Sequence, residues 1–136
     1  CALVAFVPNY ELKTSDSRNV LPSEWTYKEA VAASAIANVA IAALAKGDLR
    51  VAGKAIEADR FHERYRQQLV AEFPQVKDIA HQHEAYATYL SGAGPTIMTL
   101  LPVEHSEAFA KDLESKDLNG QVFSLKIDTT GVKVEA

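Results

Sequence analysis

The segment Tyr89-Leu-Ser-Gly-Ala-Gly-Pro-Thr-Ile97 is the most informative stretch of this 136-residue chain. Two glycines separated by one alanine reach backbone angles that a Cβ atom disfavours, and they let a second loop or a ligand approach closely. Pro95 fixes its own φ and disfavours helical geometry at Gly94. Alternating residues precede the segment and an apolar run follows it. We therefore predict a tight loop between two strands, called the glycine loop below, made of Ser91, Gly92, Ala93 and Gly94; an ordinary glycine-rich turn is the alternative interpretation.

Helical segments are predicted before and after this loop. Residues 27–46 are alanine-rich, which favours a helix, with Thr26 or Ser23 as its cap and Gly47 as the residue that ends it. Because its side chains are small nearly all round, this helix is expected to pack closely against both a sheet and other helices. Asp48 caps the next predicted helix. Three more are indicated by the apolar sets Phe61, Tyr65 and Leu69, ended by Pro74; Val76, Ile79, Ala80 and His83; and Phe109, Ala110 and Leu113.

Strand patterns occupy the two ends of the chain. Residues 2–7 form an apolar run of strand length that Pro8 ends, and residues 11–19 are polar and predicted to be extended or turn-like. Residues 122–127 alternate, residues 128–131 read as a turn, and Val132 and Val134 are predicted to pair back as an edge strand. Strands mixed with segregated helices indicate an α+β sandwich with a largely antiparallel sheet. No internal boundary is indicated, so residues 1–136 are taken as one domain.

Composition excludes several classes of function. A net charge of −4 without a Lys/Arg stripe argues against nucleic-acid binding. No uninterrupted apolar stretch approaches the ~20 residues that cross a bilayer, so no membrane association is expected. One cysteine excludes an internal disulfide framework and agrees with a cytoplasmic protein. His81 and His83 would point about 200° apart on a helix, and we nominate no metal ligand.

The string Leu-Ser-Gly-Ala-Gly-Pro-Thr resembles the third conserved motif of the GHMP kinases, a family of small-molecule kinases. A second stretch resembles the Thr-x-x-x-Arg-x-x-Leu-Pro pattern of the homoserine kinases within that family. Here the pattern is Thr14, Arg18, Leu21 and Pro22. The resemblance implies a ferredoxin-like α/β sandwich, the fold of the family's carboxy-terminal domain.

A third match supports the same family. Tyr65-Arg66 resembles the Glu-Pro-Tyr-Arg element of homoserine kinases, with Arg64 where the family has proline. The three matches follow the family order and span nearly the whole chain. The chain therefore resembles the carboxy-terminal part of a homoserine kinase.

The family's nucleotide-phosphate loop, Pro-x-x-x-Gly-Leu-Gly-Ser-Ser-Ala, does not occur in the sequence. We therefore expect the chain to be a fragment without the amino-terminal nucleotide-loop domain, and inactive by itself. The family's magnesium-liganding and charge-stabilising groups belong to that missing portion. Glu57, Asp59 and Glu63 are interpreted as solvated helix charges, so no catalytic residue and no metal ligand is nominated here.

The resemblance implies transfer of the ATP γ-phosphate, with Mg²⁺, to the hydroxyl of L-homoserine, giving O-phospho-L-homoserine for threonine biosynthesis. It also implies that Arg18 and Arg66 bind the substrate, because a planar guanidinium donates two parallel hydrogen bonds to a carboxylate. Arg64 is a second candidate for the role of Arg66. Thr14 lies near the reacting end of the site by resemblance, or else caps the turn that leads to Arg18, as Asp16 also could.

The glycine loop is expected to brace the absent nucleotide-phosphate loop, and its N–H groups could form a small anion nest. Two rival functions remain open. One is another GHMP kinase, for example one that phosphorylates mevalonate. The other is a non-enzymatic ferredoxin-like module that binds an amino acid and regulates a partner. The sequence does not fix the oligomeric state, and a homodimer is possible.

Overall fold

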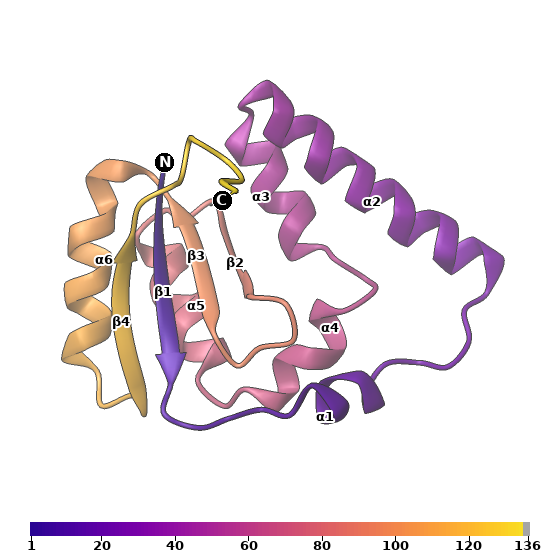
Figure 1. Ribbon diagram of the computed structural model, residues 1–136, viewed down its shortest axis with the longest axis horizontal. Coiled ribbons are helices and arrows are strands. Elements are labelled where there is room, and N and C mark those ends of the chain that lie inside the picture. Colours follow the sequence, from indigo (N-terminus) through magenta and orange to yellow (C-terminus); the bar gives the residue numbers. More distant parts are fainter. Residues whose placement is uncertain (135–136) are drawn as a thin grey trace.

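Four antiparallel strands form one sheet in the order β2-β3-β1-β4 (Figure 1). In the computed structural model, which describes residues 1–134, the strands are β1 (Ala2–Pro8), β2 (Ala87–Leu90), β3 (Ile97–Leu101) and β4 (Gly120–Leu125). β1 pairs with β3 on one side and with β4 on the other, while β2 pairs with β3 and leaves its second edge outside the sheet. The predicted α+β fold with an antiparallel sheet is confirmed.

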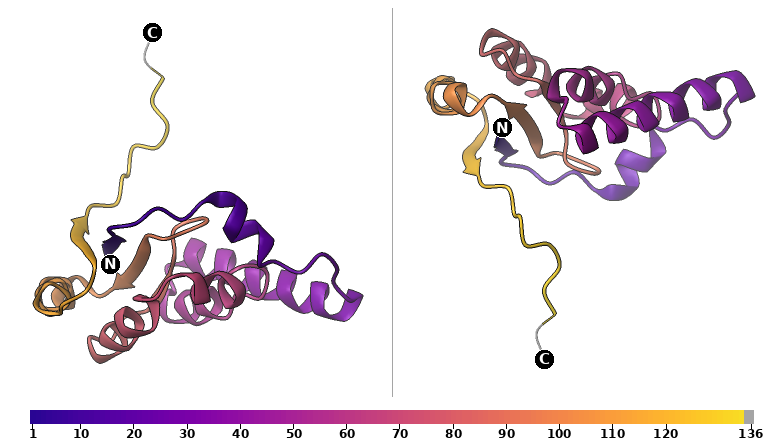
Figure 2. Two further views of the ribbon diagram at one scale, coloured as in Figure 1. Left: turned by 90° about the horizontal axis from the view of Figure 1, so that it is seen from below. Right: turned by 90° about the horizontal axis from the view of Figure 1, so that it is seen from above.

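Helices α5 and α6 cover one face of this sheet (Figures 1 and 2). On the opposite face, residues 126–134 extend away from the body of the protein (Figure 2). Helices α2 and α3 lie beyond the β2 edge. The helices are α1 (Thr14–Asn19), α2 (Tyr27–Lys46), α3 (Leu49–Glu57), α4 (Glu63–Arg66) followed by the 3₁₀ turn η1 (Gln67–Leu69), α5 (Phe73–Gln82) and α6 (Val103–Ser115).

The hydrophobic core lies between the sheet and the helices α5 and α6. Three phenylalanines, Phe6, Phe73 and Phe109, are fully buried there, each from a different element. Burying such a side chain contributes about 1.5–3 kcal/mol. The inward residues of α6 are Phe109, Ala110 and Leu113, as the sequence predicts. The core therefore fixes the β2–β3 hairpin and the glycine loop at its tip.

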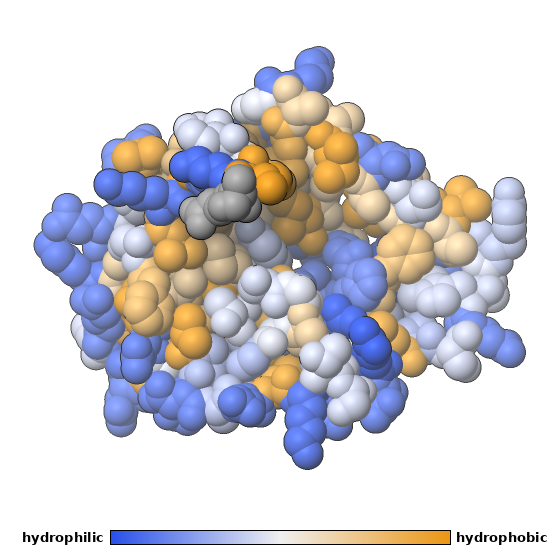
Figure 3. Space-filling view, in the orientation of Figure 1, coloured by the Kyte–Doolittle hydropathy of each residue, from blue (hydrophilic) through white to orange (hydrophobic). Residues whose placement is uncertain are grey.

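Helix α2 begins and ends where the sequence predicts. Thr26 and Glu29 form a capping box, and Gly47 ends the helix with φ +74°. The expected packing against the sheet is wrong, because α2 packs mainly on α3 and leaves much of its apolar surface exposed. Figure 3 shows this apolar surface over α2 and α3. Within residues 1–134, α2 is also long and apolar enough by length and composition to cross a membrane. Core helices of other proteins meet the same criteria.

Three local predictions are wrong, each for a physical reason. Residues 14–19 form α1 instead of an extended segment, because contacts of Ser17 with the glycine loop stabilise a polar turn that has no apolar periodicity of its own. Pro74 lies in the first turn of α5 and ends no helix, since a first-turn proline loses no intrahelical hydrogen bond. Val132 and Val134 form no strand: they are 94% and 91% exposed.

Candidate functional site

The glycine loop joins β2 to β3 as predicted, and two of its residues adopt left-handed backbone angles. Gly92 has φ +62° and Gly94 has φ +82°. The loop is closed by two backbone hydrogen bonds, from Ser91 N to Thr96 O at 2.8 Å and from Gly94 N to Ser91 O at 3.1 Å. A Cβ atom at Gly94 would meet its neighbours only at ordinary van der Waals distance. The requirement for glycine at position 94 therefore comes from the backbone angle and not from lack of space.

Helix α1 carries two of the predicted substrate residues. Thr14 is its first residue and Arg18 lies in its last turn, and both side chains are exposed. The residue before the helix is Lys13 and no side chain caps it, so neither Thr14 nor Asp16 is a capping residue. Within residues 1–134 no side-chain hydrogen bond or ion pair engages Arg18. Its guanidinium is thus available to a ligand.

Ser17 joins α1 to the glycine loop, a contact that the sequence analysis did not anticipate. Its side chain is fully buried, and its hydroxyl donates a hydrogen bond of 2.7 Å to the carbonyl oxygen of Ala93. No sequence signal distinguishes Ser17 from the exposed Ser15 two residues earlier. Only the packing of α1 against the loop does so.

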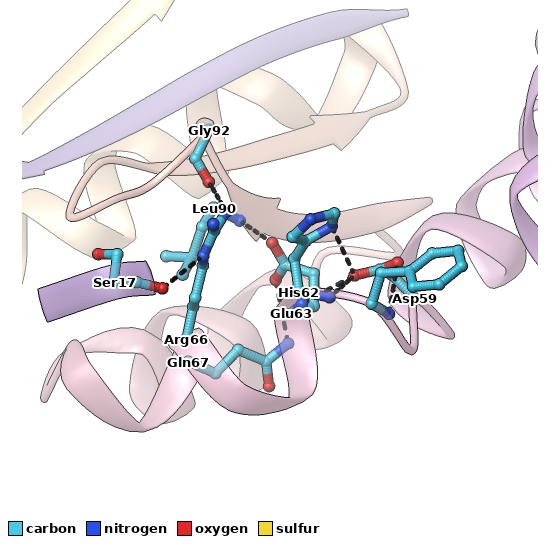
Figure 4. A network of polar contacts seen from close by, with 9 residues as sticks. Ser17, Asp59, His62, Glu63, Arg66, Gln67, Leu90 and Gly92 are labelled. Carbon is cyan, nitrogen blue, oxygen red and sulfur yellow. Dashed lines mark hydrogen bonds and ion pairs between the residues drawn. The ribbon is translucent and has the colours of Figure 1, made fainter. Parts of the chain in front are cut away.

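Arg66, which lies in α4, contacts both α1 and the glycine loop (Figure 4). Its Nε donates to Ser17 O at 3.0 Å, and its Nη1 donates to Gly92 O at 3.1 Å. The guanidinium of Arg66 therefore lies at the residue directly before Arg18. Arg64 takes a different position, with its guanidinium 5.4 Å from the centre of the Tyr65 ring. The three sequence matches thus meet around Arg66 and not around Arg64.

The interpretation of Glu63 and Glu57 as solvated charges is wrong. Glu63 is 8% exposed; its Oε1 accepts a hydrogen bond from Leu90 N at 3.0 Å, and its Oε2 accepts one from Gln67 Nε2 at 3.1 Å. Burial raises the pKa of the Glu63 carboxyl. The Oε1 of Glu57 accepts a hydrogen bond from Thr88 N at 2.8 Å and its Oε2 pairs with Lys77 at 3.0 Å. Both carboxylates therefore hold the outer edge of β2.

Asp59 fixes the turn that carries Glu63. Its carboxylate accepts hydrogen bonds from the backbone N–H groups of Phe61, His62 and Glu63 at 2.7–3.1 Å. Phe61 and Tyr65, which the sequence placed on one helix face, both pack edge-on against Trp25. These contacts hold α4 beside the glycine loop.

A hollow of about 450 Å³ opens beside Arg66 and Gly92. Its lining combines apolar residues of α2 and α3 with the polar residues Asp59, His62 and Glu63. A mostly apolar hollow with a few polar groups is the usual form of a small-molecule site. Within residues 1–134 no group of three His, Cys, Asp or Glu side chains is arranged to hold a metal ion.

The chain is similar to known proteins of one family. The family model described as "GHMP kinases C terminal" matches residues 40–118, more than half of the chain. The chain belongs to the GHMP kinases. Homoserine kinase of Streptococcus gordonii is 62% identical over 135 residues, which are 99% of this chain and 47% of that protein.

GHMP kinases of known structure share this fold. Homoserine kinase of Cytophaga hutchinsonii superimposes with a TM-score of 0.80 and 25% identity, over 96% of this chain and 42% of that one. Mevalonate kinase of L. major, solved with R-mevalonate, gives a TM-score of 0.72 and 19% identity, over 90% of this chain and 41% of that one. The chain spans about half the length of the GHMP kinases it matches, and the fold alone does not distinguish their substrates.

Proposed function

We propose that residues 1–136 are the carboxy-terminal, substrate-binding domain of a homoserine kinase, which transfers the ATP γ-phosphate to the hydroxyl of L-homoserine and forms O-phospho-L-homoserine for threonine biosynthesis. One observation carries the proposal. Arg66 joins Ser17, the neighbour of Arg18, to Gly92 of the glycine loop, so the three segments that resemble homoserine kinases converge at one place. The 62% identity to a homoserine kinase supports the choice of homoserine.

The chemistry that this site supports is positioning. Phosphoryl transfer to a hydroxyl requires that the acceptor be aligned and that charge on the phosphoryl oxygens be stabilised. L-Homoserine carries an α-carboxylate at the end opposite its hydroxyl. We assign that carboxylate to Arg18, with the remaining N–H groups of Arg66 as a second donor, and we place Thr14 near the reacting end. The glycine loop, residues 91–94, would brace the nucleotide-phosphate loop of the missing half.

The other half of the protein would have to supply the groups that this chain lacks. ATP is the phosphate donor in this proposal, and Mg²⁺ would be bound by residues outside the described part of the chain. The isolated 136-residue chain is accordingly expected to be inactive. We further propose a cytoplasmic enzyme, and a homodimer is compatible with the apolar surface that α2 and α3 expose.

The experiment that tests this function uses the full-length protein. ADP release is measured with ATP and Mg²⁺ in the presence of L-homoserine or mevalonate at equal concentration. Homoserine-dependent ADP release, absent with mevalonate, is expected. The reverse preference would identify a mevalonate-type GHMP kinase instead. Binding of homoserine without any ADP release would favour the regulatory module.

The role of Arg18 is tested by Arg18→Leu in the same full-length protein. Loss of a hydrogen bond to a charged group costs about 1.5–3 kcal/mol. At 1.4 kcal/mol per decade the KM for homoserine should rise roughly ten-fold to a hundred-fold, with little change in the KM for ATP. Arg18→Lys should recover part of the loss, because it keeps the charge without the planar fork.

A substrate analogue provides the control for this assignment. L-Homoserine amide, which lacks the negative charge, should be a poor substrate of the parent protein and should lose little more with Arg18→Leu. Equal weakening of homoserine and ATP by Arg18→Leu would show that the carboxylate assignment is wrong.

A further inference from the structure

The outer edge of β2 is held by two carboxylates at alternate residues. β2 pairs with β3 on one side only, so the N–H groups of Thr88 and Leu90 point away from the sheet. Glu57 accepts from Thr88 N at 2.8 Å and Glu63 accepts from Leu90 N at 3.0 Å. An exposed edge strand is a liability that proteins cover, and these two side chains cover it. The two contacts differ in their distance from the glycine loop: Glu63 binds Leu90, which immediately precedes the loop, whereas Glu57 binds Thr88, two residues further away.

Glu63 makes further contacts that covering the β2 edge does not require. Its backbone N–H is bound by Asp59 at 2.8 Å, its second carboxylate oxygen is bound by Gln67, and the residue is 8% exposed. Burying a carboxylate costs free energy unless hydrogen bonds compensate for the lost water. Both oxygens of Glu63 have such a partner. The carboxylate is thus held in one position relative to the end of β2.

Glu63 and Arg66 act on the loop from one face of α4. Residues three apart on a helix are neighbours, so the carboxylate and the guanidinium point the same way (Figure 4). The carboxylate binds the backbone N–H of Leu90, and the guanidinium binds the backbone carbonyl of Gly92. One turn of α4 therefore binds the chain at Leu90, directly before the glycine loop, and again at Gly92 within it.

We infer that Glu63 is a positioning residue of the kinase site: its buried carboxylate fixes the end of β2 and thereby the direction in which the glycine loop meets the nucleotide-phosphate loop that it is proposed to brace. This inference rests on the proposed function for its catalytic consequence, but not for its effect on the loop. Glu63 touches no reacting atom and acts through Leu90. Its role differs from that of Glu57, which holds the same strand without reaching the loop.

The test compares Glu63→Ala with the matched variant Glu57→Ala in the full-length protein. Each removes a carboxylate from one N–H of β2. The readouts are the free energy of unfolding in urea, the exchange rates of the amide hydrogens of Leu90, Ser91 and Gly94, and the KM and kcat for ATP and homoserine. Both variants are expected to lose stability.

Only Glu63→Ala is expected to lower kcat/KM for ATP by about ten-fold and to accelerate exchange at Ser91 and Gly94. Glu63→Gln should restore most of the activity, because the amide oxygen still accepts from Leu90 N. If Glu63→Ala and Glu57→Ala reduce kcat/KM in proportion to their loss of stability, Glu63 is only an edge cover and the inference is overturned.

The experiment also covers failure of the proposed function and failure of Glu63→Ala to fold. If the unmodified protein does not phosphorylate homoserine, the proposed function fails, while exchange at Ser91 and Gly94 still tests whether Glu63 orders the loop. If Glu63→Ala does not fold, Gln67→Ala replaces it, because this change removes only the second anchor of the carboxylate. Faster exchange at Leu90 and Ser91 in Gln67→Ala supports the inference, and unchanged exchange there refutes it.

Discussion

In the full-length protein, Arg66→Ala removes the side chain that joins α1 to the glycine loop. Two hydrogen bonds are lost, one of 3.0 Å to Ser17 O, which is partly buried, and one of 3.1 Å to Gly92 O, which is exposed. A hydrogen bond from a charged donor contributes about 1.5–3 kcal/mol when shielded from solvent. The exposed bond is screened by water and contributes about 1 kcal/mol or less. The combined loss is therefore about 2–4 kcal/mol.

Steady-state kinetics and urea unfolding together distinguish loss of the contact between α1 and the glycine loop from loss of overall stability. At 1.4 kcal/mol per decade, a loss of about 2 kcal/mol in the arrangement that Arg66 holds between α1 and the glycine loop lowers kcat/KM for homoserine roughly 30-fold. Arg64→Ala is the matched control on the same helical turn. It removes a cation–π contact with Tyr65, which contributes about 0.5–1 kcal/mol at an exposed site, and leaves both bridging hydrogen bonds of Arg66 in place.

Arg66→Lys adds a second check. A lysine ammonium cannot reproduce the planar fork, so it should restore one bond at most and recover activity only in part. Steady-state kinetics and urea unfolding are measured on all three variants. Equal kinetics in Arg66→Ala and Arg64→Ala would refute the bridge and would reopen Arg64 as the second substrate arginine.

Three other predictions follow from single contacts. Gly53→Ala should destabilise the protein in urea, because its Cβ would collide with the carbonyl of Tyr86, whereas Gly47→Ala meets no neighbour and should cost only the ~1–2 kcal/mol of a left-handed residue. Ser17→Ala should cost about 1–3 kcal/mol by leaving a loop carbonyl without its donor, and exposed Ser15→Ala should be neutral in the same unfolding experiment. Burial, together with a hydrogen bond to Glu72, raises the pKa of Tyr10 to about 12 from 10.0. The stability that the protonated Tyr10 hydroxyl contributes is therefore complete below pH 10 and is lost as the pH rises towards 12. Tyr10→Phe should abolish that part of the pH dependence of the free energy of unfolding.

The sequence by itself determined the elements whose signals are local. Thr26 and Gly47 mark the two ends of α2 through capping and left-handed geometry, which depend on the residues themselves. The alternation around residues 87–101 and the glycines between gave the β2–β3 hairpin, because period two and positive φ are properties of short stretches of chain.

Tertiary structure decided what depends on contacts between distant segments. Residues 14–19 carry no helical periodicity, and the helix there is held by contacts of Ser17 with the glycine loop and with Arg66. Glu63 looks like a surface charge in the sequence and becomes a buried acceptor because the outer edge of β2 lies beside it. The motif match favoured Arg66 over Arg64 without a physical reason, and the reason is that the Arg66 side chain reaches Ser17 and Gly92 whereas Arg64 lies against Tyr65. Such roles depend on contacts between residues tens of positions apart, and neither hydrophobic periodicity nor turn chemistry reports those contacts.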